Sequence, residues 1–543
     1  MTATPHTAEV ARRRTFAIIS HPDAGKTTLT EKLLLFSGAI HVAGSVKARK
    51  ASRHATSDWM EIEKQRGISV ASSVMQMLYR EHVINLLDTP GHRDFSEDTY
   101  RVLTAVDSAL MVIDAANGVE AQTKRLIEVC RQRDTPIMTF VNKMDREGRD
   151  PIELLDEIEA ELGMPCVPMT WPVGQGKAFG GIINLCTQTM RVFRPGEDTV
   201  EASAAEEIPL SDTATLKARF GADFDHAMAN IELLSGVSPA FDREAFLAAR
   251  QTPVFFGSAV NNFGVQEVLD ALVDLAPPPH PRASSNADGS LTEIAPDSEG
   301  FSGVVFKVQA NMDPQHRDRI AFVRVCSGKY ASGMKLKVVR SGKEMRPTSV
   351  VTFLSQRREA VDEAYAGDII GFTIHGGVQL GDTITDGASL QFTGLPFFAP
   401  ELFQTVELKN PLKSKQLQQG LAQLGEEGAI QVFKPQLGSL MLLGAVGQLQ
   451  FEVVQHRLST EYKAEIALKG SQFVGARWVT CDDPAEMKKF MDYNATKLAY
   501  DAANTLAYLC TSPYDVRLAQ ERFPKIHFHP LREHAGLALQ TAG

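Results

Sequence analysis

The chain has 543 residues, of which 43% are hydrophobic and 22% are charged, and its formal net charge is −10. This length predicts about three to four domains with cores of ordinary size. Because the charge balance is acidic, the composition gives no overall electrostatic basis for binding nucleic acid, and any contact with RNA has to come from local patches. The six cysteines are scattered without metal-ligand spacing, and no apolar segment is long enough for a signal peptide or a membrane span. We therefore expect a reduced, cytoplasmic protein with no zinc site and no membrane attachment.

The first predicted element is a strand at Phe16–Ile19, which is followed by a loop, Ser20–Thr27, and an amphipathic helix. Strand, tight loop and helix in this order are the context of a phosphate-binding loop, whose backbone N–H groups and helix N-terminus bind an anion. Lys26 would then reach the β- and γ-phosphates, and the hydroxyl of Thr27 would bind Mg²⁺. The loop departs from the usual pattern at its first glycine, which here is Ser20. The nucleotide-binding residues predicted in this segment are Ser20, His21, Pro22, Asp23, Ala24, Gly25, Lys26, Thr27 and Thr28.

A long polar stretch, Ala39–Val70, follows the first helix. Irregular stretches of this length inside a compact domain are usually functional or mobile. Because this one comes after a phosphate loop, we interpret it as a switch segment that the γ-phosphate and Mg²⁺ order. Ser69 is its candidate hydroxyl ligand for Mg²⁺.

The strand Val83–Leu87 runs into a second nucleotide segment, Asp88-Thr89-Pro90-Gly91-His92. A carboxylate at the end of a strand beside a phosphate loop is suited to an indirect contact with Mg²⁺, and Asp88 has this position. Gly91 permits the close approach that brings a backbone N–H to the γ-phosphate. We predict that all five residues of this segment line the GTP site.

The third segment, Asn142-Lys143-Met144-Asp145, follows the predicted strand at 136–141. The carboxylate of Asp145 can accept hydrogen bonds from both N1–H and the 2-amino group of guanine. Adenine offers no such pair of donors, so this one residue can set base identity through the cost of leaving buried groups unpaired. Asn142 can bond N7 of the base, and the stem of Lys143 can lie along the base plane.

A further strand, Pro253–Phe256, ends in Gly257-Ser258-Ala259, where the N–H groups near Ser258 and Ala259 are positioned to meet O6 of guanine. The segments occur in a fixed order, and most of them stand directly after a strand of an alternating β/α pattern. In open α/β sheets, ligands bind outside the carboxyl ends of the strands. We therefore interpret the chain up to about residue 281 as a GTP-binding domain.

The remaining pattern predicts an α/β protein in which a P-loop GTPase domain with a mostly parallel sheet precedes a β-barrel and a C-terminal α/β sandwich. Short alternating segments punctuated by glycines indicate the barrel, and a mixed helix and strand pattern indicates the last domain. The predicted boundaries are 1–282 for the GTP-binding domain with an inserted subdomain around 165–250, 283–300 for a linker, 301–392 for the barrel and 393–543 for the C-terminal domain. The basic and aromatic stretch at 514–534 is compatible with contacts to RNA or protein and equally with a solvated face.

Five segments together resemble those of the translational GTPases, namely Ser20–Thr27, Arg66–Val70, Asp88–His92, Asn142–Asp145 and Gly257–Ala259. Three runs resemble the bacterial peptide chain release factor 3 family more closely. These runs are Ser20–Thr28, Asp88–Tyr100 and Gly447–Val454. The resemblance extends over nearly the whole chain. It implies a ribosome-stimulated GTPase that promotes dissociation of class-I peptide release factors from the ribosome after translation termination.

This resemblance also implies ligands, partners and roles. GTP or GDP and Mg²⁺ would be bound, the ribosome and class-I release factors would be partners, and the protein would be a cytoplasmic monomer. His92 would orient the attacking water, and Thr27 with Ser69 would bind Mg²⁺. The wider superfamily commonly has threonine at the position of Ser69, and serine keeps the hydroxyl.

Three other interpretations remain open from the sequence. A translocase similar to elongation factor G, or a ribosomal-protection protein, would carry more domains after the third. A GTPase subunit that regulates a metabolic enzyme, such as a sulfurylase, would share the first two domains but is not expected to match Gly447–Val454. A scaffold that binds GTP without turnover would not need His92, which is placed to position water.

Overall fold

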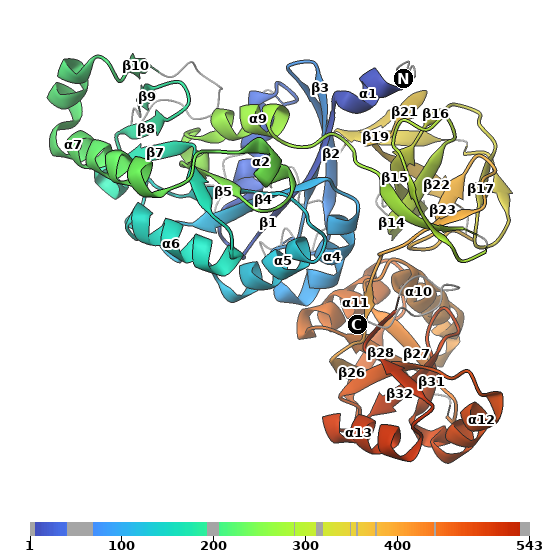
Figure 1. Ribbon diagram of the computed structural model, residues 1–543. Coiled ribbons are helices and arrows are strands. Elements are labelled where there is room, and N and C mark those ends of the chain that lie inside the picture. The colour runs from blue at the N-terminus through green and yellow to red at the C-terminus, as the bar shows by residue number, and fades with distance from the viewer. Residues whose placement is uncertain are drawn as a thin grey trace.

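The computed structural model describes residues 6–40, 69–192, 206–286, 288–310, 319–347, 349–354, 357–374, 377–438 and 441–532. Figure 1 shows a first domain with a lobe at its far end, a second domain of curled strands, and a third domain below the second. Most of the predicted switch segment, Ala39–Val70, lies outside the described residues. Among the described helices, none is long and apolar enough to cross a membrane.

The first domain is built on a seven-stranded sheet with the strand order β2-β3-β1-β4-β5-β11-β6. Strands β3, β1, β4, β5, β11 and β6 run parallel, and β2 is antiparallel to β3 at one edge. The central strands are buried along their whole length, as expected for a parallel sheet covered on both faces. The strands are β1 (Arg13–Ser20), β2 (Ser73–Tyr79), β3 (His82–Asp88), β4 (Ser108–Asp114), β5 (Ile137–Asn142), β6 (Cys166–Pro168) and β11 (Thr252–Phe256).

Helices cover both faces of this sheet (Figure 1). Alternate residues of β1 point to opposite faces, so that Phe16 and Ile18 pack with α2 and α9, whereas Ala17 and Ile19 belong to the core beneath α4, α5 and α6. The helices of this domain are α1 (Thr7–Ala11), α2 (Lys26–Phe36), α4 (Ser96–Thr104), α5 (Ala121–Arg131), α6 (Pro151–Leu162) and α9 (Val265–Asp274), with short 3₁₀ helices η1 (Arg93–Phe95) and η3 (Ala259–Asn261).

The register of the parallel strands brings their carboxyl ends to one edge of the sheet. Ile18 of β1 pairs with Asp88, the last residue of β3. Asp114 and Asn142, the last residues of β4 and β5, pair with each other. The loops that follow these strands therefore meet at a single edge, and four of the five predicted segments follow strands that end there.

The lobe at the end of the first domain is an antiparallel sheet with the order β10-β9-β8-β7, packed against a long helix. Its elements are β7 (Thr170–Val173), η2 (Gly176–Ala178), β8 (Gly181–Asn184), β9 (Thr189–Val192), β10 (Glu207–Pro209), α7 (Thr213–Val237) and α8 (Arg243–Leu247). The sequence pattern did not predict α7, because much of its surface is exposed and its backbone breaks at Gly221, where φ is 51°. Asp242 caps α8, since its side chain accepts from the N–H groups of Glu244 and Ala245.

The prediction of a linker over 283–300 is wrong for much of that segment. A hairpin of β12 (Arg282–Asn286) and β13 (Leu291–Ile294) forms there, and β24 (Leu390–Phe392) adds a third strand. The hydroxyl of Ser284 bonds to Thr292 across the hairpin, and the turn is closed by Asp288, whose carboxylate accepts from Ser290. Serine and aspartate make these local bonds as readily as they make a linker, so composition alone did not separate the two structures.

The second domain is a curled antiparallel sheet of eight strands in the order β18-β17-β23-β14-β15-β22-β19-β20, with a small two-stranded sheet of β16 and β21. Its interior holds apolar side chains from alternate strand positions, which agrees with the predicted barrel pattern. The strands are β14 (Ser302–Ala310), β15 (Arg319–Ser327), β16 (Lys329–Ala331), β17 (Leu336–Val338), β18 (Glu344–Met345), β19 (Val350–Leu354), β20 (Arg357–Ala360), β21 (Glu363–Tyr365), β22 (Ile369–Ile374) and β23 (Thr383–Thr385).

The third domain has an eight-stranded sheet in the order β29-β26-β28-β27-β31-β32-β30-β33, flanked by helices. This is the predicted α/β arrangement. The strands are β25 (Phe397–Phe398), β26 (Leu402–Leu408), β27 (Gln431–Pro435), β28 (Leu442–Ala445), β29 (Ile466–Gly470), β30 (Gly475–Thr480), β31 (Leu498–Tyr500), β32 (Leu506–Cys510), β33 (His527–His529) and β34 (Leu531–Arg532). The helices are α10 (Ser414–Glu426), α11 (Gln448–Thr460), α12 (Pro484–Tyr493) and α13 (Pro513–Arg522), with η4 (Pro411–Lys413) and η5 (Ala495–Lys497).

Buried charges join the first domain to the second. Asp107 at the start of β4 is fully buried, and its carboxylate lies 2.5 Å from the guanidinium of Arg324 on β15 and 3.0 Å from His280. Arg13 of β1 pairs with Asp368 at 2.8 Å. Burial by itself would raise the pKa of Asp107, but Arg324 and the other surrounding cations hold it well below its usual range. This carboxyl is therefore ionised in the folded protein.

Candidate nucleotide-binding site

The loop after β1 has the backbone that a phosphate-binding loop requires. Gly25 precedes the first residue of α2 and has φ of 95°, a left-handed conformation that glycine adopts without strain. A Cβ at Gly25 would lie 2.3 Å from Nδ2 of Asn142, so no larger residue fits. Ser20, which replaces the usual first glycine, is buried and bonds through its hydroxyl to the carbonyl of His21 within the loop.

Lys26 and Asp88 meet at the base of the site. The ammonium of Lys26 donates to Oδ1 of Asp88 at 2.8 Å, and both side chains are buried. The other carboxylate oxygen, Oδ2 of Asp88, is buried without a hydrogen-bond partner among the described residues. Thr27 stands beside Lys26 in the first turn of α2, together with Thr28. A buried carboxylate oxygen without a partner and a nearby hydroxyl are oxygen donors of the kind that Mg²⁺ prefers, so these residues fit the ion.

The segment from Asp88 to His92 lies against the phosphate loop. The hydroxyl of Thr89 donates to the carbonyl of Ile18 in β1 at 2.7 Å. A Cβ at Gly91 would lie 3.2 Å from the backbone nitrogen of Pro22, which leaves little room for a side chain. Pro90 is buried, and its carbonyl accepts from Thr99 of α4. The structure therefore brings the first and second predicted segments into contact.

Asn142 forms hydrogen bonds to two other predicted loops and so connects three of them. Its Nδ2 donates to the carbonyl of Ala24 in the phosphate loop, and its Oδ1 accepts from the N–H of Ala259, each at 2.9 Å. The sequence predicted that Asn142 bonds the guanine base, and the structure adds that its amide braces the loops that would surround the base. This bracing was missed because it depends on contacts between residues more than 110 positions apart.

Asp145 is oriented by a hydroxyl that sequence reasoning did not assign. Ser258 donates to Oδ1 of Asp145 at 2.6 Å, and Asn261 donates to the hydroxyl of Ser258 at 2.9 Å. Ser258 is fully buried, whereas Asp145 is partly exposed at the surface of the site. Sequence reasoning assigned Ser258 only a backbone role, and the position of its side chain next to the carboxylate of Asp145 follows from the fold alone.

Lys143 and Met144, which lie between Asn142 and Asp145 in the sequence, have different surroundings. The ammonium of Lys143 lies 2.6 Å from the carboxylate of Asp114 and also donates to the carbonyl of Asp23. These bonds hold the stem of Lys143 across the phosphate loop. Met144 is fully buried, so its side chain belongs to the core, and only its backbone faces the loops. Asp114 is a further residue that sequence reasoning missed, although its position at the end of β4 was a usable signal.

Three predicted residues, His21, Ser69 and His92, are each half-buried. His21 directs Nε2 to the carboxylate of Glu120 at 2.8 Å. His92 is about one-third exposed, and its Nδ1 accepts from the backbone N–H of Asp94 at 3.3 Å. Ser69 is described and half-buried, but residues 41–68 of its predicted switch segment lie outside the described part of the chain.

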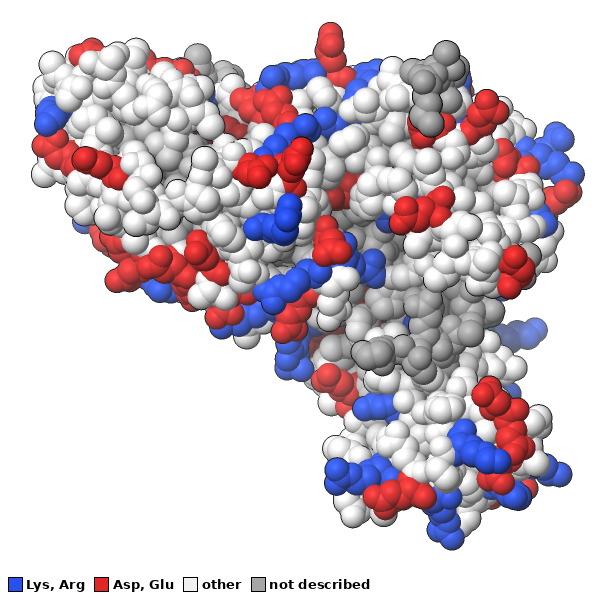
Figure 2. Space-filling view, viewed as in Figure 1, with Lys and Arg blue, Asp and Glu red and all other residues white. Residues whose placement is uncertain are grey.

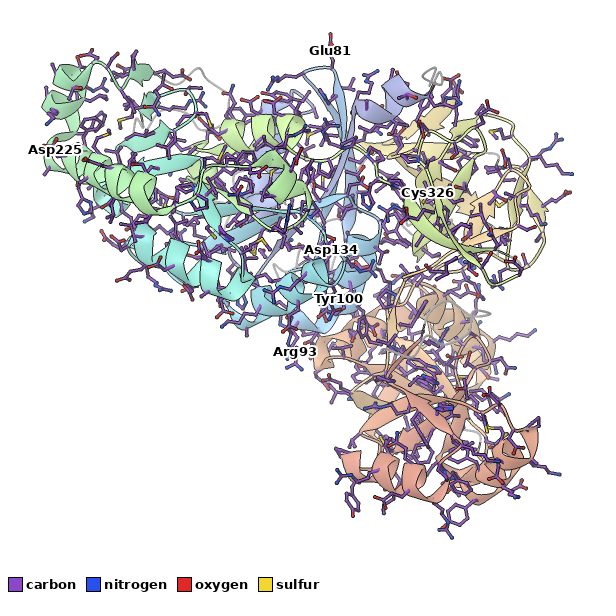
Figure 3. All side chains as sticks on the ribbon, in the orientation of Figure 1. Glu81, Arg93, Tyr100, Asp134, Asp225 and Cys326 are labelled. Carbon is purple, nitrogen blue, oxygen red and sulfur yellow. The ribbon has the colours of Figure 1, made fainter. Side chains whose placement is uncertain are left out.

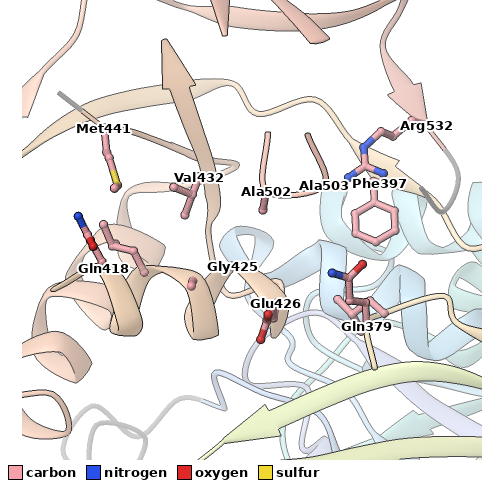
Figure 4. Close-up of a pocket in the computed structure, with 13 residues that line it drawn as sticks. Gln379, Phe397, Gln418, Gly425, Glu426, Val432, Met441, Ala502, Ala503 and Arg532 are labelled. Carbon is pink, nitrogen blue, oxygen red and sulfur yellow. The ribbon is translucent and has the colours of Figure 1, made fainter. Parts of the chain in front are cut away.

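A separate cavity lies between the second and third domains (Figure 4). Its volume is about 250 Å³, and its walls include Gln379 of the second domain and Gln418, Glu426 and Arg532 of the third. None of the predicted nucleotide-binding residues lines it. On the face drawn in Figure 2, basic and acidic side chains of the described residues are interspersed, so charge does not single out another anion site on that face.

Comparisons with known proteins agree with this geometry. The family model of the elongation factor Tu GTP binding domain matches residues 11–278, that of elongation factor G domain 2 matches 300–387, and that of the C-terminal domain of class II release factor RF3 matches 392–520. A solved structure from Thermus thermophilus superposes with a TM-score of 0.68 at 24% identity, covering 87% of this chain and 71% of that chain, which shows the fold.

Curated relatives match over nearly the whole length. Peptide chain release factor 3 of Bordetella pertussis is 67% identical over 529 residues, which cover 97% of this chain and 98% of the relative. Peptide chain release factor 3 of Nitrosomonas europaea is 66% identical over 535 residues, which cover 98% and 99%. With four loops of a GTPase gathered at one sheet edge and this identity across all three domains, the chain belongs to the peptide chain release factor 3 family.

Proposed function

We propose that this chain is a ribosome-stimulated GTPase that promotes dissociation of class-I peptide release factors from the ribosome after translation termination. The observation that carries the proposal is the convergence of the phosphate loop, the Asp88–His92 segment and the Asp145–Ser258 pair at one edge of the first sheet. The identity to release factors of this family supports the second half of the proposal. The protein would act on ribosomes in the cytoplasm, as a monomer.

The base and the phosphates would be held by different loops. Asp145, held by Ser258, would accept from the guanine base, and Asn142 would support the loops around it. Lys26 would turn from Asp88 toward the β- and γ-phosphates, since its flexible stem permits this movement. The N–H groups at the start of α2 would bind phosphate oxygens in the same loop.

Three oxygen groups of this chain would hold Mg²⁺. Thr27 and Ser69 would supply hydroxyls, and Asp88 would use its buried Oδ2 for an indirect contact. When bound, Mg²⁺ neutralises charge that develops on the phosphate oxygens. The chain itself would contribute the orientation of Thr27 and Asp88, which α2 and β3 hold.

His92 would orient the attacking water. Its Nδ1 accepts from the N–H of Asp94, and in the neutral ring this leaves the proton on Nε2. A partly exposed ring can be moved into place by a partner. The structure thus suits a GTPase whose hydrolysis is slow until the ribosome binds.

The test is GTP turnover with and without ribosomes. We expect stimulation on the order of 10³–10⁵ by ribosomes, as in other activated GTPases. His92→Ala should leave GTP affinity nearly unchanged and remove most of the stimulated turnover. A wild-type protein that ribosomes do not stimulate would contradict the proposed function, and a His92→Ala variant with the full stimulated rate would contradict the role of His92.

A further inference from the structure

The residue that contacts His92 also contacts the third domain. Oδ2 of Asp94 accepts from the backbone N–H of Leu449 at 2.7 Å. Leu449 lies in the first turn of α11, a helix of 13 residues that begins at Gln448. A carboxylate is favoured at this position, because the first N–H groups of a helix have no partner within the helix and its N-terminus is electropositive. Asp94 therefore caps a helix that belongs to another domain.

Gly447 makes this contact possible. A Cβ at Gly447 would lie 1.9 Å from the carboxyl carbon of Asp94 and 2.2–2.3 Å from its two oxygens. The backbone of Gly447 is extended, with φ of −144°, so any residue is conformationally allowed there. The reason for glycine is therefore the space that the carboxylate of Asp94 occupies.

On its other side, Asp94 holds the ring of His92. The backbone N–H of Asp94 donates to Nδ1 of His92 at 3.3 Å, and Oδ1 of Asp94 lies 3.5 Å from the same nitrogen. One short segment therefore determines the orientation of the His92 ring and binds the start of α11. Because Oδ1 and Oδ2 belong to one carboxylate, a displacement of α11 that moves this carboxylate also changes the distance from Oδ1 to the ring of His92.

Neighbouring contacts surround this junction, beside a cavity of about 60 Å³. Phe95, next to Asp94, packs with Val70, Val453 and Leu449 in a small apolar cluster between the two domains. Polar contacts flank the cluster on α4 and η1, where Glu97 accepts from Gln431, Arg101 donates to the carbonyl of Gly428, and Arg93 pairs with Glu401. Figure 3 shows Arg93 and Tyr100 at the edge of the first domain that faces the third.

The interface between the second and third domains contains a larger cavity than the junction at Asp94. The cavity of about 250 Å³ lies there, between Gln379 of the second domain and α10 of the third (Figure 4). At Gly447 there is no room for one methyl group beside Asp94, so a shift of α11 toward η1 displaces the carboxylate of Asp94.

We propose that Asp94 is a positioning residue through which docking of α11 controls the orientation of His92. The third domain then regulates the hydrolytic step without contacting the nucleotide. A partner that shifts the third domain, such as the ribosome, changes the orientation of His92 through this contact. The inference rests on the proposed function, because it assigns a regulator to the proposed water-orienting residue.

The test compares Gly447→Ala with a matched control, Gly470→Ala, in ribosome-stimulated GTP turnover of the full chain. Gly470 is in the same domain, and a Cβ there meets nothing within 4 Å. We expect Gly447→Ala to lower kcat at saturating ribosomes by at least about tenfold, because small displacements of catalytic groups have effects of this size. GTP affinity and the ribosome concentration for half-maximal rate should stay within about twofold of wild type, as should all parameters of Gly470→Ala.

Variants of Asp94 form the second part of this test. Asp94→Ala removes the acceptor for Leu449 and should lower kcat as Gly447→Ala does, whereas Asp94→Asn keeps an acceptor oxygen and should recover most of the rate. The double variant Asp94→Ala with Gly447→Ala should be no slower than the slower single variant, because both changes break one contact.

The outcomes separate the two proposals. If wild type is stimulated and His92→Ala is not, but the Asp94 and Gly447 variants keep the wild-type kcat, this inference is wrong and the proposed function stands. If these variants lose GTP affinity or thermal stability in proportion to kcat, the contact is only structural and the inference is also wrong. A wild-type protein without stimulation would overturn both.

Discussion

At the scale of single residues, we expect Asp145 to set the selectivity for guanine. Its carboxylate would present two acceptors to a guanine base, which offers two donors. Asp145→Asn replaces one acceptor by a donor, which matches the carbonyl that xanthine has in place of the 2-amino group of guanine. We expect GDP affinity to fall by at least about a hundredfold and affinity for xanthosine diphosphate to rise, since a mismatched polar pair in a binding site is costly. Equilibrium titration with both nucleotides measures this, and unchanged preference for guanosine would refute the base-reading role.

Ser258 gives a second prediction at this scale. Its hydroxyl donates to Asp145 at 2.6 Å, and hydrogen bonds to charged groups contribute about 1.5–3 kcal/mol. Ser258→Ala should therefore weaken GDP binding by about tenfold or more while leaving selectivity for guanine in place. Ser235→Ala, at an exposed position on α7, is the matched control and should bind GDP as wild type does. Equal affinities for Ser258→Ala and wild type would show that Asp145 needs no support.

The sequence predicted residue types better than it predicted contacts. The residues of the phosphate loop and of the Asp88–His92 segment lie together as expected, because each follows a strand that ends at the same sheet edge. Two contacts that hold the loops of the site in place were not predicted, namely the Lys143–Asp114 ion pair and the hydrogen bond from Ser258 to Asp145. They join residues 29 and 113 positions apart, so they exist only once the sheet has formed. The roles of the site residues themselves remain predictions.

At the scale of elements, the phosphate loop is set by the junction of β1 and α2. Gly25 has a left-handed backbone and touches Asn142, so Gly25→Ala introduces both strain and a clash. Gly38 follows the C-terminal end of α2 with φ of 76°, and a Cβ there would meet nothing within 4 Å. Gly38→Ala therefore introduces strain alone, which makes it the matched control.

We expect Gly25→Ala to abolish measurable GDP binding and Gly38→Ala to keep it, with a loss of stability of about 1–2 kcal/mol at most. Calorimetric titration and thermal unfolding of the two variants measure this difference. If Gly25→Ala bound GDP with the wild-type affinity, the loop would not be the phosphate site.

Element prediction succeeded where hydrophobic periodicity was strong and failed where other forces decide. The buried strands β3, β5 and β11 were predicted to within about one residue at each end, because a parallel sheet covered on both faces has continuous apolar runs. Helix α7 was missed because little of it is buried. The hairpin of β12 and β13 was taken for a linker because serine, aspartate and glycine suit both structures.

At the scale of the whole molecule, the buried charges at Asp107 join the first and second domains. Asp107→Asn would leave Arg324 buried with a neutral partner, and breaking a buried ion pair costs about 3–5 kcal/mol. We expect the first thermal unfolding transition of Asp107→Asn to lie several degrees below that of wild type at pH 7. Asp223→Asn, on the exposed surface of α7, is the matched control and should unfold as wild type does.

The difference in unfolding temperature between wild type and Asp107→Asn should change with pH in a definite direction. The pKa of Asp107 in the folded protein lies below its ordinary value, which is about 3.9 in an unfolded chain. Its stabilising contribution is therefore complete above that pH and is lost as pH falls toward the folded-state pKa. The gap between the two unfolding transitions should persist from pH 7 to pH 5 and narrow below about pH 4. A gap that closed as pH rose would contradict the assignment of an ionised Asp107.

The order of the three domains could be predicted because each has a different pattern, and the fold class is confirmed by the structure and the comparisons. The contacts between domains could not be predicted. Asp107 and Arg324 are 217 residues apart, and Asp94 and Leu449 are 355 apart, with no local pattern that marks them as partners. The domain boundaries remain predictions, with the segment 283–300 corrected to a hairpin over part of its length.

The proposed function is tested most directly by measuring the rate at which a fluorescently labelled class-I release factor leaves post-termination ribosomes. We expect the full chain with GTP to accelerate this departure. We expect the His92→Ala variant with GTP still to accelerate the first departure and then to fail to turn over on fresh complexes. If the labelled factor left no faster with the chain and GTP than without them, while ribosomes still stimulated GTP turnover, the chain would be a translational GTPase with another task, and the proposed function would be wrong.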